Sequence, residues 1–215
     1  MAHLSKDKNL THAFNNNIDV HSSTAAEVFG VSIDNVTQDQ RRSAKAINFG
    51  LMYGMSAFGL TRQLGIPRGE AQEYLDAYFA RYTGVRDYMD NIKAKAKEDK
   101  YVETIMARRL YLNEINAANG LRRQAAERAA INAPLQGSAA DIIKKAMLDI
   151  DDLILNEMPD VKMIMQVHDE LVFECPKDNA ETVMEKTKET MEKTVKLEIP
   201  LIAEAAIGSN WNEAH

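Results

Sequence analysis

Three adjacent polar residues, His168, Asp169 and Glu170, lie between two apolar runs in the C-terminal third of the chain. The runs, residues 163–167 and 171–173, predict a strand, a tight turn and a second strand. Carboxylate oxygens held at the rim of a sheet suit a divalent cation such as Mg²⁺. Turns also favour Asp for backbone reasons, so an ordinary polar hairpin turn is the alternative for this pattern taken alone.

A second group of residues has the spacing of a binding stripe. Arg41, Lys45, Phe49 and Tyr53 recur every four residues in a segment that we expect to be helical. At about 100° per residue each step of four drifts by only about 40°, so the four side chains follow one face. Two cations followed by two aromatic rings match the polarity of a nucleoside triphosphate, through charge and stacking. An amphipathic helix with core aromatics and solvated cations would give the same pattern.

A third group, Arg128, Asn132 and Gln136, is also spaced by four residues, with alanines between its members. Arg, Asn and Gln are side chains that hydrogen-bond base edges and sugar oxygens. The degenerate acceptor pattern of a duplex minor groove would allow contact with them that does not depend on sequence. A solvated helix face broken by Pro134 is the alternative.

Composition indicates a soluble globular protein with a substantial core, since 45% of its 215 residues are hydrophobic. No apolar run approaches the roughly 20 residues that span a bilayer, and the N-terminus does not look like a signal peptide. We therefore expect a cytoplasmic protein without a membrane partner. Cys175 is the single cysteine, which excludes an internal disulfide.

Charge is unevenly distributed around the net value of -6. Residues 100–150 hold 8 basic and 5 acidic side chains, whereas residues 151–215 hold 6 and 15. A mildly basic centre leaves room for local phosphate contacts, although it would attract a polyanion less strongly than a uniformly basic domain would.

The order of predicted elements favours an α+β fold with an antiparallel sheet, because the strands come late and are joined by turns. In the first half of the chain we expect helices at 22–30, at 37–53, from Pro67 and at 84–99, followed by an irregular hairpin at 101–112 that turns at Ala107. A long helix from Leu121 should be interrupted near Pro134 and Gly137 and resume over 142–157. The hairpin at 163–174, a helix at 179–195 and a strand at 201–207 complete the expected order. A composition shift near residues 113–121 suggests a boundary between a helical lobe and a sheet lobe.

Taken together and in this order, these motifs closely resemble the C-terminal part of family A DNA polymerases, the bacterial DNA polymerase I type. The resemblance extends over nearly the whole chain. It rests on Asp19-Val-His21, the segments 41–54 and 128–136, and the segment 166–173. It implies a palm remnant at residues 1–14, a helical fingers subdomain at 15–118 and a partial palm with an antiparallel sheet at 119–215.

The resemblance also implies roles for single residues. Arg41 and Lys45 would bind the triphosphate, with Lys45 a candidate proton donor to the pyrophosphate, and Phe49 would pack against its sugar and base. Tyr53 would occupy the place of the template base before the fingers close, and His21 would touch the phosphate tail. The remaining roles fall to Arg128, Asn132 and Gln136 at the primer-template minor groove, Asp169 as a magnesium ligand, Glu170 as its supporting carboxylate and His168 at the primer terminus.

The implied reaction is attack of a primer 3′-hydroxyl on the α-phosphate of a deoxynucleoside triphosphate, with two Mg²⁺ ions stabilising the attacking and leaving oxygens. In the family, the first metal-binding aspartate stands just ahead of the segment that begins this chain, and a thumb grips the duplex. We therefore expect the 215 residues alone to be inactive or nearly so, and to bind nucleotide and DNA weakly at most. A smaller departure is Ala107, where the family commonly has glycine.

Two other classes of function remain open. A non-catalytic nucleic-acid or nucleotide-binding module would bind DNA in a salt-sensitive way without turnover. A helical scaffold, in which the stripes are only packing, would tolerate changes at Arg41, Lys45 and Asp169. The oligomeric state is not determined by the sequence.

Overall fold

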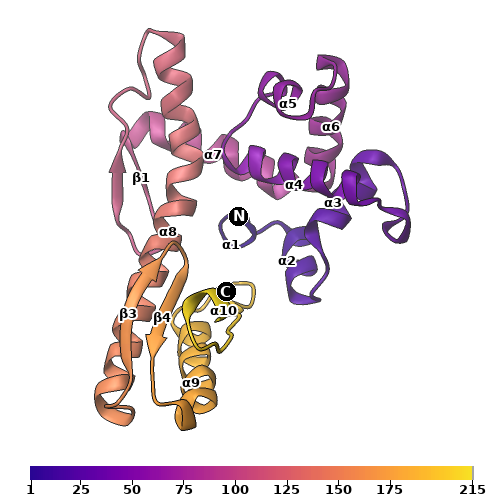
Figure 1. Ribbon diagram of the computed structural model, residues 1–215. Helices are drawn as coiled ribbons and strands as arrows, with labels where there is room; N and C mark the ends of the chain where they lie inside the picture. Colours follow the sequence, from indigo (N-terminus) through magenta and orange to yellow (C-terminus); the bar gives the residue numbers. More distant parts are fainter. Residues whose placement is uncertain (215) are drawn as a thin grey trace. The chain divides into compact units, whose positions relative to one another are not determined.

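The computed structural model describes residues 1–214, which form ten α-helices, two short 3-10 helices and two antiparallel hairpins (Figure 1). The α+β prediction is confirmed. In chain order the elements are α1 (Ala2–Ser5), α2 (Lys8–Asn15), α3 (Val20–Phe29), η1 (Ile33–Asn35), α4 (Gln38–Met52), α5 (Ala57–Leu64), α6 (Arg68–Arg81), α7 (Thr83–Asp99), β1 (Tyr101–Glu103), β2 (Arg109–Tyr111), α8 (Gly120–Glu157), β3 (Lys162–Val167), β4 (Glu170–Glu174), η2 (Lys177–Asn179), α9 (Ala180–Lys193) and α10 (Trp211–Ala214).

The chain packs as two compact units, Met1–Gln136 and Gly137–His215. These units are defined by which residues pack together. The functional boundary between fingers and palm, expected between residues 118 and 119, stays a prediction. None of the described helices is long and apolar enough to cross a membrane.

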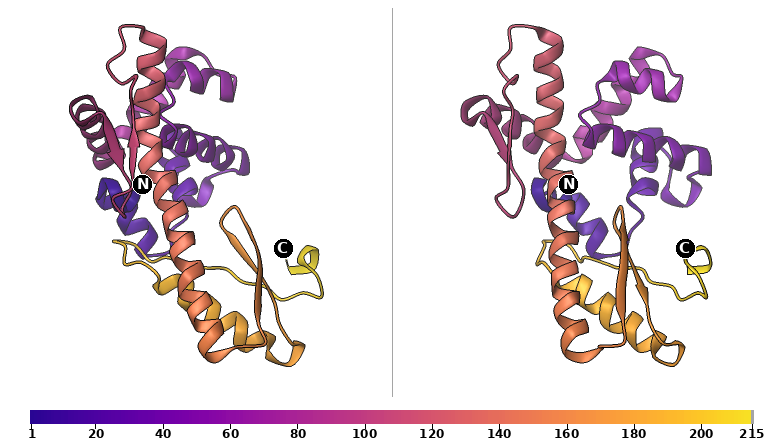
Figure 2. Two further views of the ribbon diagram at one scale, coloured as in Figure 1. Left: turned by 90° about the vertical axis from the view of Figure 1, so that its left-hand side faces the viewer. Right: turned by 60° about the vertical axis from the view of Figure 1, so that its left-hand side comes forward.

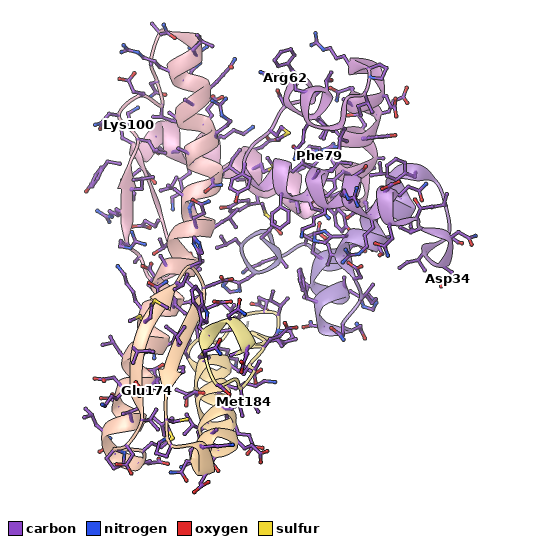
Figure 3. All side chains as sticks on the ribbon, in the orientation of Figure 1. Asp34, Arg62, Phe79, Lys100, Glu174 and Met184 are labelled. Carbon is purple, nitrogen blue, oxygen red and sulfur yellow. The ribbon has the colours of Figure 1, made fainter. Side chains whose placement is uncertain are left out.

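The first unit is built around helices α3, α4 and α6, whose ends are fixed by local signals. Helix α4 starts with a capping box, because the Thr37 side chain accepts from the Gln40 backbone N–H and the Gln40 side chain accepts from the Thr37 backbone N–H. Helix α3 begins two residues earlier than the sequence suggested, since Asp19 is its N-cap. Phe79, labelled in Figure 3, lies on α6 in this helical group.

The sequence did not predict α5, because Gly59 lies inside it and glycine weakens a helix. The reason for this glycine is steric. A Cβ at residue 59 would lie 2.5 Å from Cγ of Met55, which is closer than carbon atoms approach one another. The packing of Met55 therefore requires a glycine here, and the helix tolerates it.

The hairpin β1–β2 pairs Tyr101 with Tyr111 and packs against α7 and the first half of α8. The shared core consists of Ala96, Val102, Leu112, Ile115, Ala126 and Ala130. Ala107 lies in the turn with φ of 60°, a left-handed conformation in which a glycine carries less strain. The departure from the family pattern thus falls where side chains are disfavoured.

Helix α8 is continuous, and the interruption predicted near Pro134 and Gly137 is wrong. Its ribbon runs unbroken in both views of Figure 2. A proline inside a helix removes one backbone hydrogen bond and destabilises the helix by about 3 kcal/mol. Pro134 is buried, however, as are Ala130 and Ile131 just before it. Burial of this face compensates for the lost bond, so packing overrides the local preference.

The second unit contains the rest of α8, the hairpin β3–β4 and α9. Its core is formed by Ile150, Ile154, Met158, Val161 and Val183. Figure 3 labels Glu174 on β4 and Met184 on α9. Lys186 of α9 binds Glu157 at the end of α8 with an N–O distance of 2.6 Å. Met163, Leu171 and Phe173 of the hairpin pack against the core that α8 and α9 form.

The strand predicted at residues 201–207 does not form. The segment has the apolar pattern of a strand, but the backbone N–H and C=O groups of a strand need a neighbouring strand as hydrogen-bond partner. Among the described residues, β3 and β4 pair only with each other. The Ala203 backbone N–H instead donates to a carboxylate oxygen of Glu192, at 3.1 Å.

Candidate functional site

The stripe of Arg41, Lys45, Phe49 and Tyr53 follows the outer side of α4. The opposite side of the helix is buried through Ala44, Ile47 and Leu51. Phe49 is 39% exposed and Tyr53 is 49% exposed, so neither ring is part of the core. The structure thus argues against the interpretation in which the aromatics are packing residues.

Arg41 is held by a carboxylate from the neighbouring helix. Its Nε lies 2.6 Å from Oδ2 of Asp19, which also accepts from the Ser22 hydroxyl at 2.8 Å, while Oδ1 accepts from the His21 backbone at 2.9 Å. Burial raises the pKa of Asp19, but the hydrogen bonds from Arg41, from Ser22 and from the backbone of residues 21 and 22 lower that pKa to about 2. Because Asp19 engages Nε, the terminal nitrogens of Arg41 are left for other acceptors.

His21 lies beside the stripe, and buried polar side chains hold its ring in place. The Asn48 amide nitrogen is 3.0 Å from Nδ1 of His21 and 3.2 Å from the Thr24 hydroxyl, which in turn lies 3.3 Å from the Tyr82 hydroxyl. Burial lowers the pKa of His21; the Asp19 charge opposes that shift, and the charges of Arg41 and Lys45 add to it.

Phe49 joins these polar groups to the aromatic end of the stripe. Its ring centroid lies 5.8 Å from that of His21, with the planes tilted by 43°, and Lys45 Nζ lies 5.7 Å from the same centroid. Two cationic side chains, one imidazole and one exposed ring thus gather on one side of α3 and α4. Such a surface suits a ligand that is anionic at one end and flat at the other.

The end of α4 meets α8, and this contact brings two of the sequence motifs together. Gly54 has φ of 67°, and a Cβ there would lie 3.0 Å from Cγ of Arg128 and 3.3 Å from Cδ1 of Ile131. Tyr53, the last member of the stripe, is therefore next to the start of the Arg128 series. Both belong to the first unit.

Arg128, Asn132 and Gln136 follow one face of α8, because the helix continues through Pro134. Arg128 and Gln136 are exposed and Asn132 is half-buried. The face is flanked by small side chains, Ala125 and Ala129, which leave it open to a broad surface. The face is therefore not broken at the proline, and the alternative of a solvated helix face keeps only its exposed side chains.

His168 and Asp169 form the two-residue turn of the hairpin β3–β4, in which Val167 pairs with Glu170. His168 has φ of 52°, and its carbonyl accepts from the Gln166 side chain. The strand, turn and strand that the sequence predicted here are confirmed. Asp169 is exposed and Glu170 is half-buried. These residues lie in the second unit.

The carboxylates of Asp169 and Glu170 are the ligand type that Mg²⁺ takes. Residues 1–214 nevertheless contain no group of three or more His, Cys, Asp or Glu side chains placed to hold a metal ion. The donor type fits Mg²⁺, but the described residues do not make a complete site.

Comparison with known proteins decides the family. The model of DNA polymerase family A matches residues 1–213. The chain belongs to DNA polymerase family A. DNA polymerase I of Pseudomonas aeruginosa is 56% identical over 215 residues, and that of Geobacillus stearothermophilus is 45% identical over 214. Each match covers 100% of this chain and 24% of the relative, so the chain spans about a quarter of their length.

Among solved structures, this family A chain is similar to the POL domain of Pol1 from M. smegmatis, determined in complex with DNA primer-template and dNTP. The TM-score is 0.95 at 44% sequence identity, and the match covers 99% of this chain and 38% of that chain. The resemblance inferred from the motifs is confirmed.

The sequence alone did not single out three polar residues behind the stripe of this family A chain: Asn48, Thr24 and Tyr82. Asn48 stands between apolar neighbours on the inner side of a predicted helix, which was the available signal. Thr24 and Tyr82 carry no local signal, because their contact with each other joins residues 58 positions apart.

Proposed function

We propose that this chain is the part of a DNA polymerase that receives the incoming deoxynucleoside triphosphate and contacts the minor groove of the primer-template. The single observation that carries the proposal is the outward stripe on α4, with cations at one end, exposed rings at the other and His21 beside it. The similar solved structure is of a complex with primer-template and dNTP, which supports the same ligands here.

Each residue of the stripe has a role that follows from its chemistry. Arg41, steered through its Nε by Asp19, would bind phosphate oxygens with its terminal nitrogens. Lys45 would bind the same triphosphate and supply a proton to the departing pyrophosphate. Phe49 would pack against the sugar and base. Tyr53 would stand where the template base enters.

The α8 face would carry the duplex contacts. Arg128, Asn132 and Gln136 would donate to minor-groove acceptors near the growing primer end, in a manner that tolerates all base pairs. Since Gly54 lies against Arg128, the fingers helix and this face are adjacent in one unit. A change at Tyr53, where the template base would enter, would therefore also affect the neighbouring contacts of Arg128 with the duplex.

Asp169, with Glu170 beside it, would give Mg²⁺ oxygen ligands in the parent enzyme, and His168 would contact the primer terminus. Mg²⁺ in such a site stabilises charge on phosphate oxygens. The parent activity would be template-directed nucleotidyl transfer to a primer 3′-hydroxyl. We propose that the 215 residues alone do not catalyse it, because the described residues do not make a complete metal site.

Primer extension with Mg²⁺ and all four deoxynucleotides tests the catalytic half of the proposal. The expected result is no incorporation by the purified 215-residue protein, and robust incorporation would overturn that expectation. Placing the same residues in the complete polymerase of their parent gene should give activity that Asp169→Ala abolishes.

Nucleotide titration followed by NMR tests the binding half. We expect weak binding, with shifts confined to the stripe and His21, and loss of most of the affinity in Arg41→Gln. The matched control is Arg42→Gln, since Arg42 is the next residue on α4, is exposed and pairs only loosely with Asp39, at 3.5 Å. Equal losses in both variants would indicate general charge attraction and contradict a specific site.

A non-catalytic nucleic-acid-binding module is the second candidate, favoured by the exposed Arg128 face. It predicts DNA binding that falls with salt, is weakened by Arg128→Ala or Lys45→Gln, and is unchanged by Asp169→Ala. Activity of the complete parent enzyme would decide against it.

A further inference from the structure

Asn48 is a buried amide on the inner side of α4, the helix whose outer side carries the stripe. It is only 4% exposed, and it lies one position before Phe49. Its amide nitrogen is 3.0 Å from Nδ1 of His21. A carboxamide nitrogen donates and never accepts, so Nδ1 accepts in this contact.

The amide is itself held in place. The Thr24 hydroxyl lies 3.2 Å from both the nitrogen and the oxygen of the Asn48 side chain, and 3.3 Å from the Tyr82 hydroxyl. Thr24 is 0% exposed and Tyr82 is 1% exposed. Buried polar groups with satisfied partners keep one orientation, because breaking a buried hydrogen bond costs about 1–3 kcal/mol.

The charges that face His21 favour a neutral ring. Arg41 and Lys45 approach from α4, and the carboxylate of Asp19 approaches from the cap of α3. The Asp19 charge is already engaged by Arg41. Burial and the two cations lower the pKa of His21, in agreement with an Nδ1 that accepts a hydrogen bond.

We infer that Asn48 is a positioning residue for His21: by donating to Nδ1 it leaves the single proton of the imidazole on Nε2, as a neutral donor for a phosphate oxygen. The phosphate ligand rests on the nucleotide binding proposed above, whereas the tautomer does not. A neutral donor beside two cations adds a hydrogen bond to the triphosphate whose strength does not vary with histidine protonation around neutral pH.

Nitrogen-15 NMR of the imidazole rings tests the tautomer in the full 215-residue chain without nucleotide. His21→Gln assigns the His21 signals among the five histidines. The expected result is a neutral ring protonated on Nε2. A ring protonated on Nδ1, or a charged ring at pH 7, would overturn the inference.

The chain contains a matched internal control. The Asn16 amide nitrogen lies 3.2 Å from Nδ1 of His12, but this pair is exposed. Water competes for both groups there, so we expect His12 to average between tautomers while His21 does not. If the two rings give the same averaged signals, the buried amide does not fix His21.

Asn48→Asp is the decisive variant, because it keeps the shape and replaces the donor with an acceptor. The proton should move to Nδ1, and the titration midpoint of His21 should rise by a pH unit or more, a tenfold change in its proton affinity. An unchanged tautomer would overturn the inference. Thr24→Val removes the hydroxyl that orients the amide and should give mixed tautomers at His21 with His12 unaffected, so it tests the same point even where Asn48→Asp fails to fold.

The functional half has its own measurement. Affinity for a deoxynucleoside triphosphate should be flat between about pH 7 and 8 in the unsubstituted protein and should vary with His21 protonation in Asn48→Asp. A flat profile in both proteins would overturn the link between Asn48 and the ligand. Absence of any binding would refute the proposed nucleotide site and, with it, this link, while the NMR results would still decide the tautomer.

Discussion

Gly54 lies so close to Arg128 that a Cβ at residue 54 would be 3.0 Å from Cγ of Arg128 and 3.3 Å from its Cα. The contact joins the end of the α4 stripe to α8, the helix that carries the proposed duplex contacts. It also explains why a small residue follows Tyr53. The positive φ of 67° adds a second reason, since side chains are disfavoured there.

Gly54→Ala should lower the free energy of unfolding by about 2 kcal/mol, roughly half from the left-handed backbone and half from the displaced Arg128 side chain. Urea unfolding measures this. Gly30→Ala is the control, because Gly30 has φ of 64° but no atom within 4 Å of the added Cβ. If both variants lose the same free energy of unfolding, the contact between residue 54 and Arg128 contributes nothing to the loss.

Ala107→Gly should stabilise the protein by about 0.5 kcal/mol. Alanine at φ of 60° carries strain of about 1–2 kcal/mol that glycine avoids, and the larger freedom of glycine in the unfolded chain offsets part of this gain. Ala125→Gly, in the exposed part of α8, should instead cost about 1 kcal/mol. A destabilised Ala107→Gly variant would show that the turn is not strained by its side chain.

Asp19→Asn keeps an N-cap for α3 and removes the charge that pairs with Arg41. At pH 6 it should cost about 1 kcal/mol or less, because the pair is about 40% exposed and solvent screens it. The pKa of Asp19 is lowered from 3.8 to about 2, so the stabilisation is present above pH 4 and is lost as the pH falls towards 2. The stability difference between the variant and the unsubstituted protein should narrow over that interval; a constant difference would contradict the ion pair.

Arg128→Ala should weaken binding to primer-template DNA by about 1–3 kcal/mol, while Asp169→Ala should leave binding unchanged in the absence of metal. Fluorescence anisotropy at two salt concentrations measures both. Arg122→Ala is the control, since Arg122 is exposed on α8 but faces another side and lies 3.8 Å from Glu114. A loss with Arg122→Ala as large as that with Arg128→Ala would show that the face has no special role.

The sequence by itself determined the elements whose signals are local. The capping box at Thr37 marks the start of α4, and the hairpin at residues 162–174 follows from alternating apolar runs around a two-residue turn. The four-residue spacing of Arg41, Lys45, Phe49 and Tyr53 placed them on one face, because helix geometry is the same in every helix. The family was inferred from the resemblance of these motifs, in their order, to those of family A DNA polymerases.

Only the tertiary structure decided the features that depend on distant residues. Helix α8 passes through Pro134 because its buried face packs, and the strand expected at residues 201–207 is absent because no strand pairs with it among the described residues. The contacts of Asp19 with Arg41, Asn48 with His21 and Gly54 with Arg128 join segments far apart in the chain. Local propensity carries no information about such partners, since their energies arise from packing and charge that exist only in the folded protein.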